Sequence, residues 1–228
     1  MRQIILDTET TGLEPERGHR IIEIGCVELI DRRLTGNDYH QYLQPGRLID
    51  EAAMEVHGIT NEFLEDKPHM EDVADDFIEY VSDAELVIHN APFDVGFIDA
   101  ELTLLGNGQL LSDFCTVIDS LEMARHMHPG QRNSLDALCK RYDIDNTQRE
   151  LHGALLDARI LAEVYLAMTG GQTNLVLGEE QIGQNGLMDI AHQPVSYKGG
   201  LKIIMANKKE LKAHETMLDS VEKPLWRS

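Results

Sequence analysis

The chain has 228 residues, of which 42% are hydrophobic and 26% are charged. This length accommodates one domain of about 150 to 200 residues plus a tail, and the composition excludes a fibrous or wholly disordered chain. The formal net charge is −20, so the chain lacks the overall basic character of proteins that bind nucleic acid unaided.

The first residues argue against a targeting segment. The apolar run 4–6 ends at Asp7 and is far shorter than the apolar core of a signal peptide or a membrane span. The three cysteines are widely spaced and form no paired motif, as is typical of proteins in a reducing compartment. We therefore predict a cytoplasmic protein without a membrane segment.

Strands are predicted before helices along the chain. Segments rich in β-branched and apolar residues occupy 3–8, 21–30 and 39–43, and the short polar turns between them indicate an antiparallel meander. Apolar residues then recur at helical spacing over 72–81, and a further apolar strand is predicted at 86–89. This order predicts an α/β fold.

Capping residues mark two later helices. Asn90 is expected to cap a helix that carries Pro92 in its first turn, where a missing backbone N–H costs nothing. Either Asn133 or Ser134 is expected to cap the next helix, whose apolar positions include Leu135. Both helices would belong to a layer that covers the sheet.

The composition changes after the last predicted helix, at 154–168, which glycines terminate. Residues 171–200 are rich in Gly, Gln and Asn, as in flexible linkers. Residues 201–228 carry a few apolar residues on a polar background, which are too few for a core. We therefore predict a folded domain over 1–170, a flexible linker over 171–200 and a docking segment over 201–228.

Acidic residues stand at two places where carboxylates could act together. Asp7 and Glu9 follow the first apolar run, and side chains at i and i+2 of a strand point to one face. Taken alone, this pair also fits a solvated strand end. Asp94 lies near a helix start, where a carboxylate commonly interacts with the helix N-terminus.

The last predicted helix contributes the third candidate position. Asp157 falls on its apolar stripe, and a carboxylate facing a core requires a partner or a metal. His152 precedes Asp157 by five residues and would face another side of an ideal helix, so we place it on the preceding loop. From there the imidazole can turn toward the same site.

Three strings containing these residues resemble the motifs of the DEDDh exonuclease superfamily. They are LDTETTGL at 6–13, HNAPFD at 89–94 and HGALLD at 152–157. Further strings, including the closing residues 225–227, resemble the family of epsilon subunits of bacterial DNA polymerase III over essentially the whole chain. The resemblance implies a ribonuclease-H-like mixed sheet flanked by helices and a proofreading 3′-to-5′ DNA exonuclease.

The resemblance also implies the roles of the candidate residues. The metal ligands would be Asp7, Glu9, Asp94 and Asp157, and His152 would be the general base, because an imidazole accepts protons near neutral pH. Oxygen ligands favour hard cations, so we expect two Mg²⁺ or Mn²⁺ ions per site.

Substrate contacts are implied in the same way. The residues expected at the terminal nucleotide are Asp7, Glu9, Thr10, Val56, His57 and Asp157. Thr10 would lie in the turn that holds the 3′ end, whereas Val56 also fits a role in core packing. Since phosphate and sugar contacts carry no base identity, we expect little sequence preference.

The tail supplies the expected partners. Gln172, Leu175 and Leu177 resemble a sliding-clamp-binding peptide, although a linker with chance aliphatic residues fits them as well. Residues 201–228 resemble the region through which epsilon subunits bind the polymerase catalytic subunit. A small accessory subunit is left open as a further partner.

The acidic excess lies in residues 1–169, which hold 33 acidic and 13 basic residues, whereas 170–228 hold seven of each. Such a domain is expected to bind a DNA end weakly by itself, and either divalent cations at the site or a partner that delivers the DNA end could compensate. Two alternatives stay open: a free-standing exonuclease for RNA trimming or DNA repair, and a non-catalytic adaptor between polymerase and clamp. The tail argues against the first, and the acidic cluster against the second.

Overall fold

The computed structural model describes residues 1–106, 108–149, 151–170 and 206–219. The chain divides into two units, and we describe each by itself. The described part of the second unit contains helix α8 (Lys208–Asp219), which was not predicted. The predicted clamp-binding residues Gln172, Leu175 and Leu177 lie outside the described residues, as do the whole predicted linker and residues 201–205 and 220–228 of the predicted docking segment.

A six-stranded mixed sheet forms the centre of the first unit. Its strands are β1 (Arg2–Thr10), β2 (Ile21–Ile30), β3 (Arg33–Leu34), β4 (Tyr39–Tyr42), β5 (Glu85–Ile88) and β6 (Thr116–Asp119). The order is β3-β2-β1-β5-β6, with β4 also paired to β2. β2 runs antiparallel to β1, β3 and β4, whereas β1, β5 and β6 are parallel. The predicted strands are confirmed within two residues, and β3 and β6 are additional.

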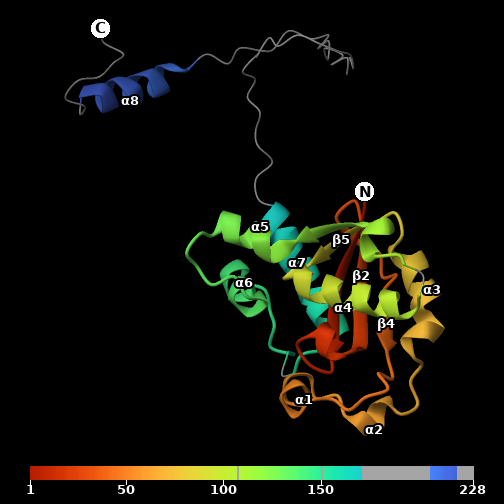
Figure 1. The fold of residues 1–228 in the computed structure, drawn as a ribbon. Coiled ribbons are helices and arrows are strands. Elements are labelled where there is room, and N and C mark those ends of the chain that lie inside the picture. Colours follow the sequence, from red (N-terminus) through yellow and green to blue (C-terminus); the bar gives the residue numbers. More distant parts are fainter. Residues whose placement is uncertain (107, 150, 171–205, 220–228) are drawn as a thin grey trace, which may run out of the picture. The chain divides into compact units, whose positions relative to one another are not determined.

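Helices cover both faces of this sheet (Figure 1). The helices on these faces are α3 (Met70–Val81), α4 (Ala91–Leu104), α5 (Ser120–Met127), α6 (Leu135–Tyr142) and α7 (Ala154–Gly170). Two short helices, α1 (Glu51–His57) and α2 (Asn61–Leu64), border a small separate core that includes Ile22 of β2. One core joins the sheet to α3 and α4, and a second core joins the other face to α5, α6 and α7. None of the described helices is both long and apolar enough to span a bilayer.

Alternation along β1 decides which side chains meet which helices. Ile4 and Leu6 belong to the core with α3 and α4, and Ile5 belongs to the core with α7. Because side chains alternate across a strand, Asp7 and Glu9 continue the side of Ile5. The two acids are therefore directed toward α7.

The helix starts differ in how they are capped. Ser134 accepts a hydrogen bond from the backbone N–H of Ala137 at 3.4 Å, so it is the cap of α6. Asn90 precedes α4 with its backbone in a left-handed conformation, at φ of 70°, and its side chain accepts no hydrogen bond from the helix. Its carbonyl accepts one from the Phe93 N–H at 3.0 Å. Its own N–H donates to Asp119 at 3.1 Å. Asn90 is thus the N-cap residue of α4, as predicted, with Pro92 in the first turn, but the side-chain hydrogen bond expected of a capping asparagine is not formed.

Candidate active site

The five predicted catalytic and metal-binding residues line one cavity of about 710 Å³. They come from three parts of the fold: the end of β1, the first turn of α4, and the start of α7 with the loop before it. The residues are Asp7, Glu9, Asp94, His152 and Asp157. Segments that are far apart in the sequence therefore meet at the C-terminal end of the central strand β1.

Asp7 and Glu9 lie in an electrostatically unfavourable position. Burial, followed by the charges of Asp94, Glu9 and Asp157, raises the pKa of Asp7 well above its usual value. Burial also raises the pKa of Glu9 to about 8, with a further contribution from Glu23, its direct cross-strand partner on β2. A bound cation would relieve this repulsion.

Asp94 is anchored to β1 by a single residue. Its Oδ1 accepts hydrogen bonds from the backbone N–H of Thr8 at 3.0 Å and from the Thr8 hydroxyl at 2.7 Å. The carboxylate is 3% exposed, and burial raises its pKa to about 7 despite those hydrogen bonds. Thr8 thus fixes Asp94 at the strand end from the opposite face of the sheet.

The start of α7 approaches β2 closely, and two β2 residues permit this. A Cβ at Gly25 would lie 2.2 Å from the Leu155 backbone, so only glycine allows the contact. Glu23 accepts a hydrogen bond from the Ala154 N–H at 3.1 Å, and His40 lies 2.7 Å from the other Glu23 oxygen. Neither Gly25 nor Glu23 was identified from the sequence. Together they position the helix turn that carries Asp157.

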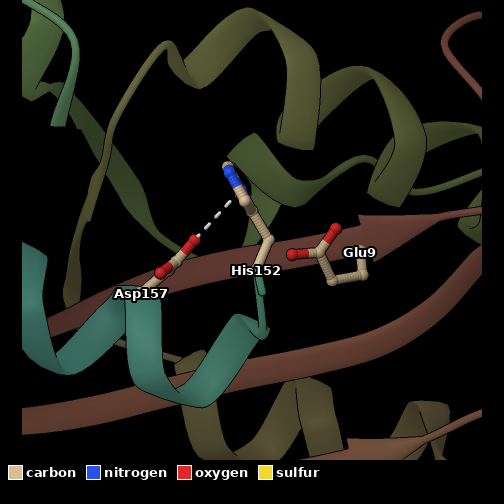
Figure 2. Close-up of side chains that lie close together, drawn as sticks. All are labelled: Glu9, His152 and Asp157. Carbon is tan, nitrogen blue, oxygen red and sulfur yellow. Dashed lines mark ion pairs between the residues drawn. The ribbon is translucent and has the colours of Figure 1, made fainter. Parts of the chain in front are cut away.

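Glu9, His152 and Asp157 form the tightest part of the site (Figure 2). Ligand atoms of the three side chains all lie within 4.8 Å of one another. His152 lies on the loop before α7, as predicted, and its backbone N–H donates to the Val56 carbonyl at 3.1 Å. Its side chain remains 45% exposed. The imidazole is therefore held at the rim, where solvent reaches it.

Arg149 was not identified from the sequence, yet it occupies the same cavity. Its Nε and Nη2 donate to the two oxygens of Asp157 at 2.5 and 2.7 Å. Burial lowers the pKa of Arg149, but the hydrogen bonds and charges of Asp157 and Asp136 outweigh this effect and raise it. The guanidinium is thus a permanent cation beside a predicted metal ligand.

A second cavity, of about 430 Å³, adjoins the first and shares Glu9 with it. Its lining includes Thr10, Val56 and His57. Val56 is 46% exposed, so the alternative that it serves core packing is wrong. Thr10 donates to the Gly12 carbonyl at 2.6 Å, and His57 Nδ1 accepts from the Ile59 N–H at 2.9 Å. This cavity is large enough for a small group of a bound ligand, next to the carboxylate of Glu9.

The side chains present fit hard divalent cations. Among the five candidate residues the donors are carboxylate oxygens and one imidazole, without a thiol, and oxygen-rich sets favour Mg²⁺ or Mn²⁺ over softer metals. Burial is the main cause of the raised pKa values of Asp7, Glu9 and Asp94. For Asp7 and Glu9 the neighbouring carboxylates raise the pKa further, and the Arg149 guanidinium only partly offsets this excess of negative charge. A cation would offset that excess.

These pKa shifts predict how metal-free stability depends on pH. A carboxyl whose pKa is raised by folding stabilises the folded state at low pH, and this contribution is lost as pH rises through the folded pKa. For Glu9 that window runs from about 4.5 to about 8. The Glu9→Gln variant is therefore expected to gain thermal stability over the wild type as pH rises from 5 to 9 in EDTA.

The comparison is made by thermal unfolding of both proteins at matched pH. Histidines with lowered pKa, such as His57, act in the opposite direction but are common to both proteins and cancel in the difference. An excess of Mg²⁺ should narrow the gap, because the cation replaces the missing counter-charge. A difference independent of pH would contradict the raised pKa of Glu9.

Comparisons with known proteins agree with this geometry. The profile of the exonuclease family matches residues 4–165. DNA polymerase III subunit epsilon of Salmonella typhimurium is 54% identical, over 100% of this chain and 98% of the relative, and that of Escherichia coli is 53% identical over the same shares. The subunit of the same name from Haemophilus influenzae is 51% identical over 97% and 91%.

Solved structures share the fold. Exonuclease X in complex with 5′ overhanging duplex DNA is 30% identical, with a TM-score of 0.59 over 74% of this chain and 91% of that one. The nuclease domain of 3′hExo, described as a DEDDh family member bound to rAMP, has a TM-score of 0.64 over 74% and 92%. At 18% identity this second likeness concerns the fold alone. The predicted ribonuclease-H-like mixed sheet flanked by helices is confirmed, and the chain belongs to the exonuclease family, among the DNA polymerase III epsilon subunits.

Proposed function

We propose that this chain is the proofreading 3′-to-5′ exonuclease of a bacterial DNA polymerase III and releases nucleoside monophosphates from a DNA 3′ end. The observation that carries the proposal is the convergence of carboxylates from β1, α4 and α7 on one cavity, beside a second cavity that can take a terminal nucleotide. Full-length similarity to proteins named DNA polymerase III subunit epsilon supports the same activity.

The residues that would hold two divalent cations, Mg²⁺ or Mn²⁺, are Asp7, Glu9, Asp94 and Asp157. Bound divalent cations lower the pKa of water and stabilise charge on the attacking and leaving oxygens of a phosphodiester. The chain supplies the placement: Thr8 fixes Asp94, and Glu23 with Gly25 fixes the turn that carries Asp157.

His152 is proposed as the general base. Its imidazole stands at the rim of the cavity, 3.4 Å from Asp157, where it can take a proton from the attacking water and pass it to solvent. Asp157 lies close enough to stabilise the imidazolium that results. The hydrogen bond from the backbone N–H of His152 to the Val56 carbonyl keeps the loop in position during this proton transfer.

The second cavity is proposed to hold the terminal nucleoside. Val56 offers an exposed apolar surface for the base or sugar, while Thr10 and His57 form the polar wall. Asp7, Glu9 and Asp157 would then lie at the scissile phosphate, with Glu9 common to both cavities. An apolar surface does not distinguish bases by hydrogen bonding, so all four nucleotides should be removed.

The tail is proposed to provide the partners. Residues 201–228 would bind the polymerase catalytic subunit and residues 172–177 the sliding clamp, within the cytoplasmic replication machinery. Tethering would raise the local concentration of DNA ends, which compensates for the acidic excess of residues 1–169. A small accessory subunit is a further candidate partner.

A primer with a mismatched, labelled 3′ end tests the proposal. The full chain is expected to release the label as mononucleotides, to stop in EDTA and to resume with Mg²⁺ or Mn²⁺. The fragment 1–170 should retain this activity but lose association with the polymerase catalytic subunit in co-purification. Release of oligonucleotides, or activity that survives EDTA, would contradict the reaction; loss of activity in the fragment would contradict the domain boundary.

A further inference from the structure

Arg149 forms a direct, two-pronged ion pair with Asp157. Two guanidinium nitrogens take both carboxylate oxygens, at 2.5 and 2.7 Å, in a fork geometry. The pair is buried, with side chains 8% and 3% exposed. Buried, bidentate charge pairs are among the strong polar contacts in proteins, so the pair will not open without a replacement for the cation.

The same guanidinium has two further contacts. Its Nη1 donates to Asp136 at 2.7 Å, and Asp136 lies at the rim with 63% of its side chain exposed. Its Nη2 lies 3.0 Å from His152 Nδ1. Arginine can only donate, so this contact makes Nδ1 the acceptor and leaves the ring proton of the neutral imidazole on Nε2. Arg149 therefore holds the candidate metal ligand and the candidate base together.

A divalent cation at Asp157 requires the same carboxylate oxygens. It would also stand within a few ångströms of a guanidinium that carries a permanent positive charge in a site poorly reached by water. Both effects oppose simultaneous binding of the metal and the fork. The guanidinium can keep its ion pair with Asp136 when it leaves Asp157, because the hydrogen bond from Nη1 to Asp136 does not involve Asp157.

We propose that Arg149 is a positioning residue that occupies Asp157 and His152 in the metal-free protein and withdraws toward Asp136 when a divalent cation binds. The inference rests on the proposed function in taking Asp157 as a metal ligand. It couples two events: the cation that claims Asp157 also frees the imidazole nitrogen that Arg149 engages. The base is then available only when the metal is present.

Metal binding to the full chain tests the inference directly. In Arg149→Gln the competing cation is absent, so the dissociation constant for Mn²⁺, followed by electron paramagnetic resonance of free Mn²⁺, should fall about tenfold, as expected for losing one charge-assisted contact. Arg159→Gln is the matched control, because it also replaces one arginine by glutamine. Arg159 lies on α7 outside the cavity, where it pairs with Asp38 at 2.8 Å. The dissociation constant of this control should change less than about twofold.

Three further measurements test the inference, and the first two do not depend on the folding of Arg149→Gln. Arg149→Lys keeps the charge but not the fork, so its affinity for Mn²⁺ should lie between those of the wild type and Arg149→Gln. In the wild type, the Nε–H resonance of Arg149 should be protected from exchange in EDTA and should shift and lose protection when Mg²⁺ is added. Thermal unfolding in EDTA should show Arg149→Gln less stable than the wild type, with a larger gain from Mn²⁺.

The outcomes separate this inference from the proposed function. Equal or weaker Mn²⁺ binding by Arg149→Gln, with normal binding by the wild type, would overturn the role of Arg149 while leaving the metal site intact. An Nε–H resonance indifferent to Mg²⁺ would overturn it as well. Failure of the wild type to bind Mn²⁺ at all would overturn both the inference and the metal-dependent reaction.

Discussion

Asp7→Asn is expected to slow DNA hydrolysis at least about a thousandfold while making the metal-free protein more stable. Loss of a ligand forfeits several kcal/mol of transition-state stabilisation, and about 1.4 kcal/mol corresponds to a factor of ten. Stability should rise because burial and the neighbouring carboxylates Asp94, Glu9 and Asp157 raise the pKa of Asp7, which means that its charge opposes folding near neutral pH.

Opposite changes in activity and stability distinguish a ligand from a structural residue. Activity is measured by single-turnover digestion of a mismatched primer, and stability by thermal unfolding in EDTA at pH 8. Asp75→Asn is the control, because Asp75 is an exposed acid on α3 away from both cavities. If Asp7→Asn retained activity, or if it lowered the metal-free unfolding temperature, Asp7 would not have the proposed role.

His152→Ala is expected to lower the single-turnover rate by about 10²- to 10⁴-fold, the range for loss of a positioned general base. Binding of Mn²⁺ should change much less, because the carboxylates remain. The rate–pH profile should also lose the limb that reports the base, since the variant has no imidazole at this position. The half-exposed position of His152 on a loop makes a large loss of fold stability unexpected.

The rate–pH profile is the measurement that separates a base from a structural residue. Single-turnover rates are collected from pH 6 to pH 9 at saturating Mn²⁺ for the wild type and the variant. His126→Ala serves as the control, since His126 is an exposed histidine on α5 that does not line the cavity. A slower variant with an unchanged pH profile would assign His152 to positioning alone.

Most strands of the sheet and all of the candidate acids could be predicted from the amino-acid sequence. Strands 3–8 and 21–30 can be predicted because each is rich in β-branched and other apolar residues, as burial between two helical layers requires. The three acidic strings indicated the family, and the structure places their residues in one cavity. By contrast, β3 has two residues and α2 has four, which is too short for a periodic pattern. β6 is as long as β5 but has only two adjacent apolar residues, whereas β5 has a run of three.

The contacts that support the site, and the presence of Arg149 in it, could not be predicted from local sequence. Glu23 meets Ala154 across 131 positions of sequence, and the need for glycine at Gly25 arises from a helix that packs on β2 far later in the chain. Nothing in the sequence around Arg149 distinguishes it from other loop arginines, and its role follows only from its contacts with Asp157 and Asp136. Local sequence reports propensity and periodicity, whereas these contacts depend on distances between distant segments, which are defined once the sheet and its helices have assembled.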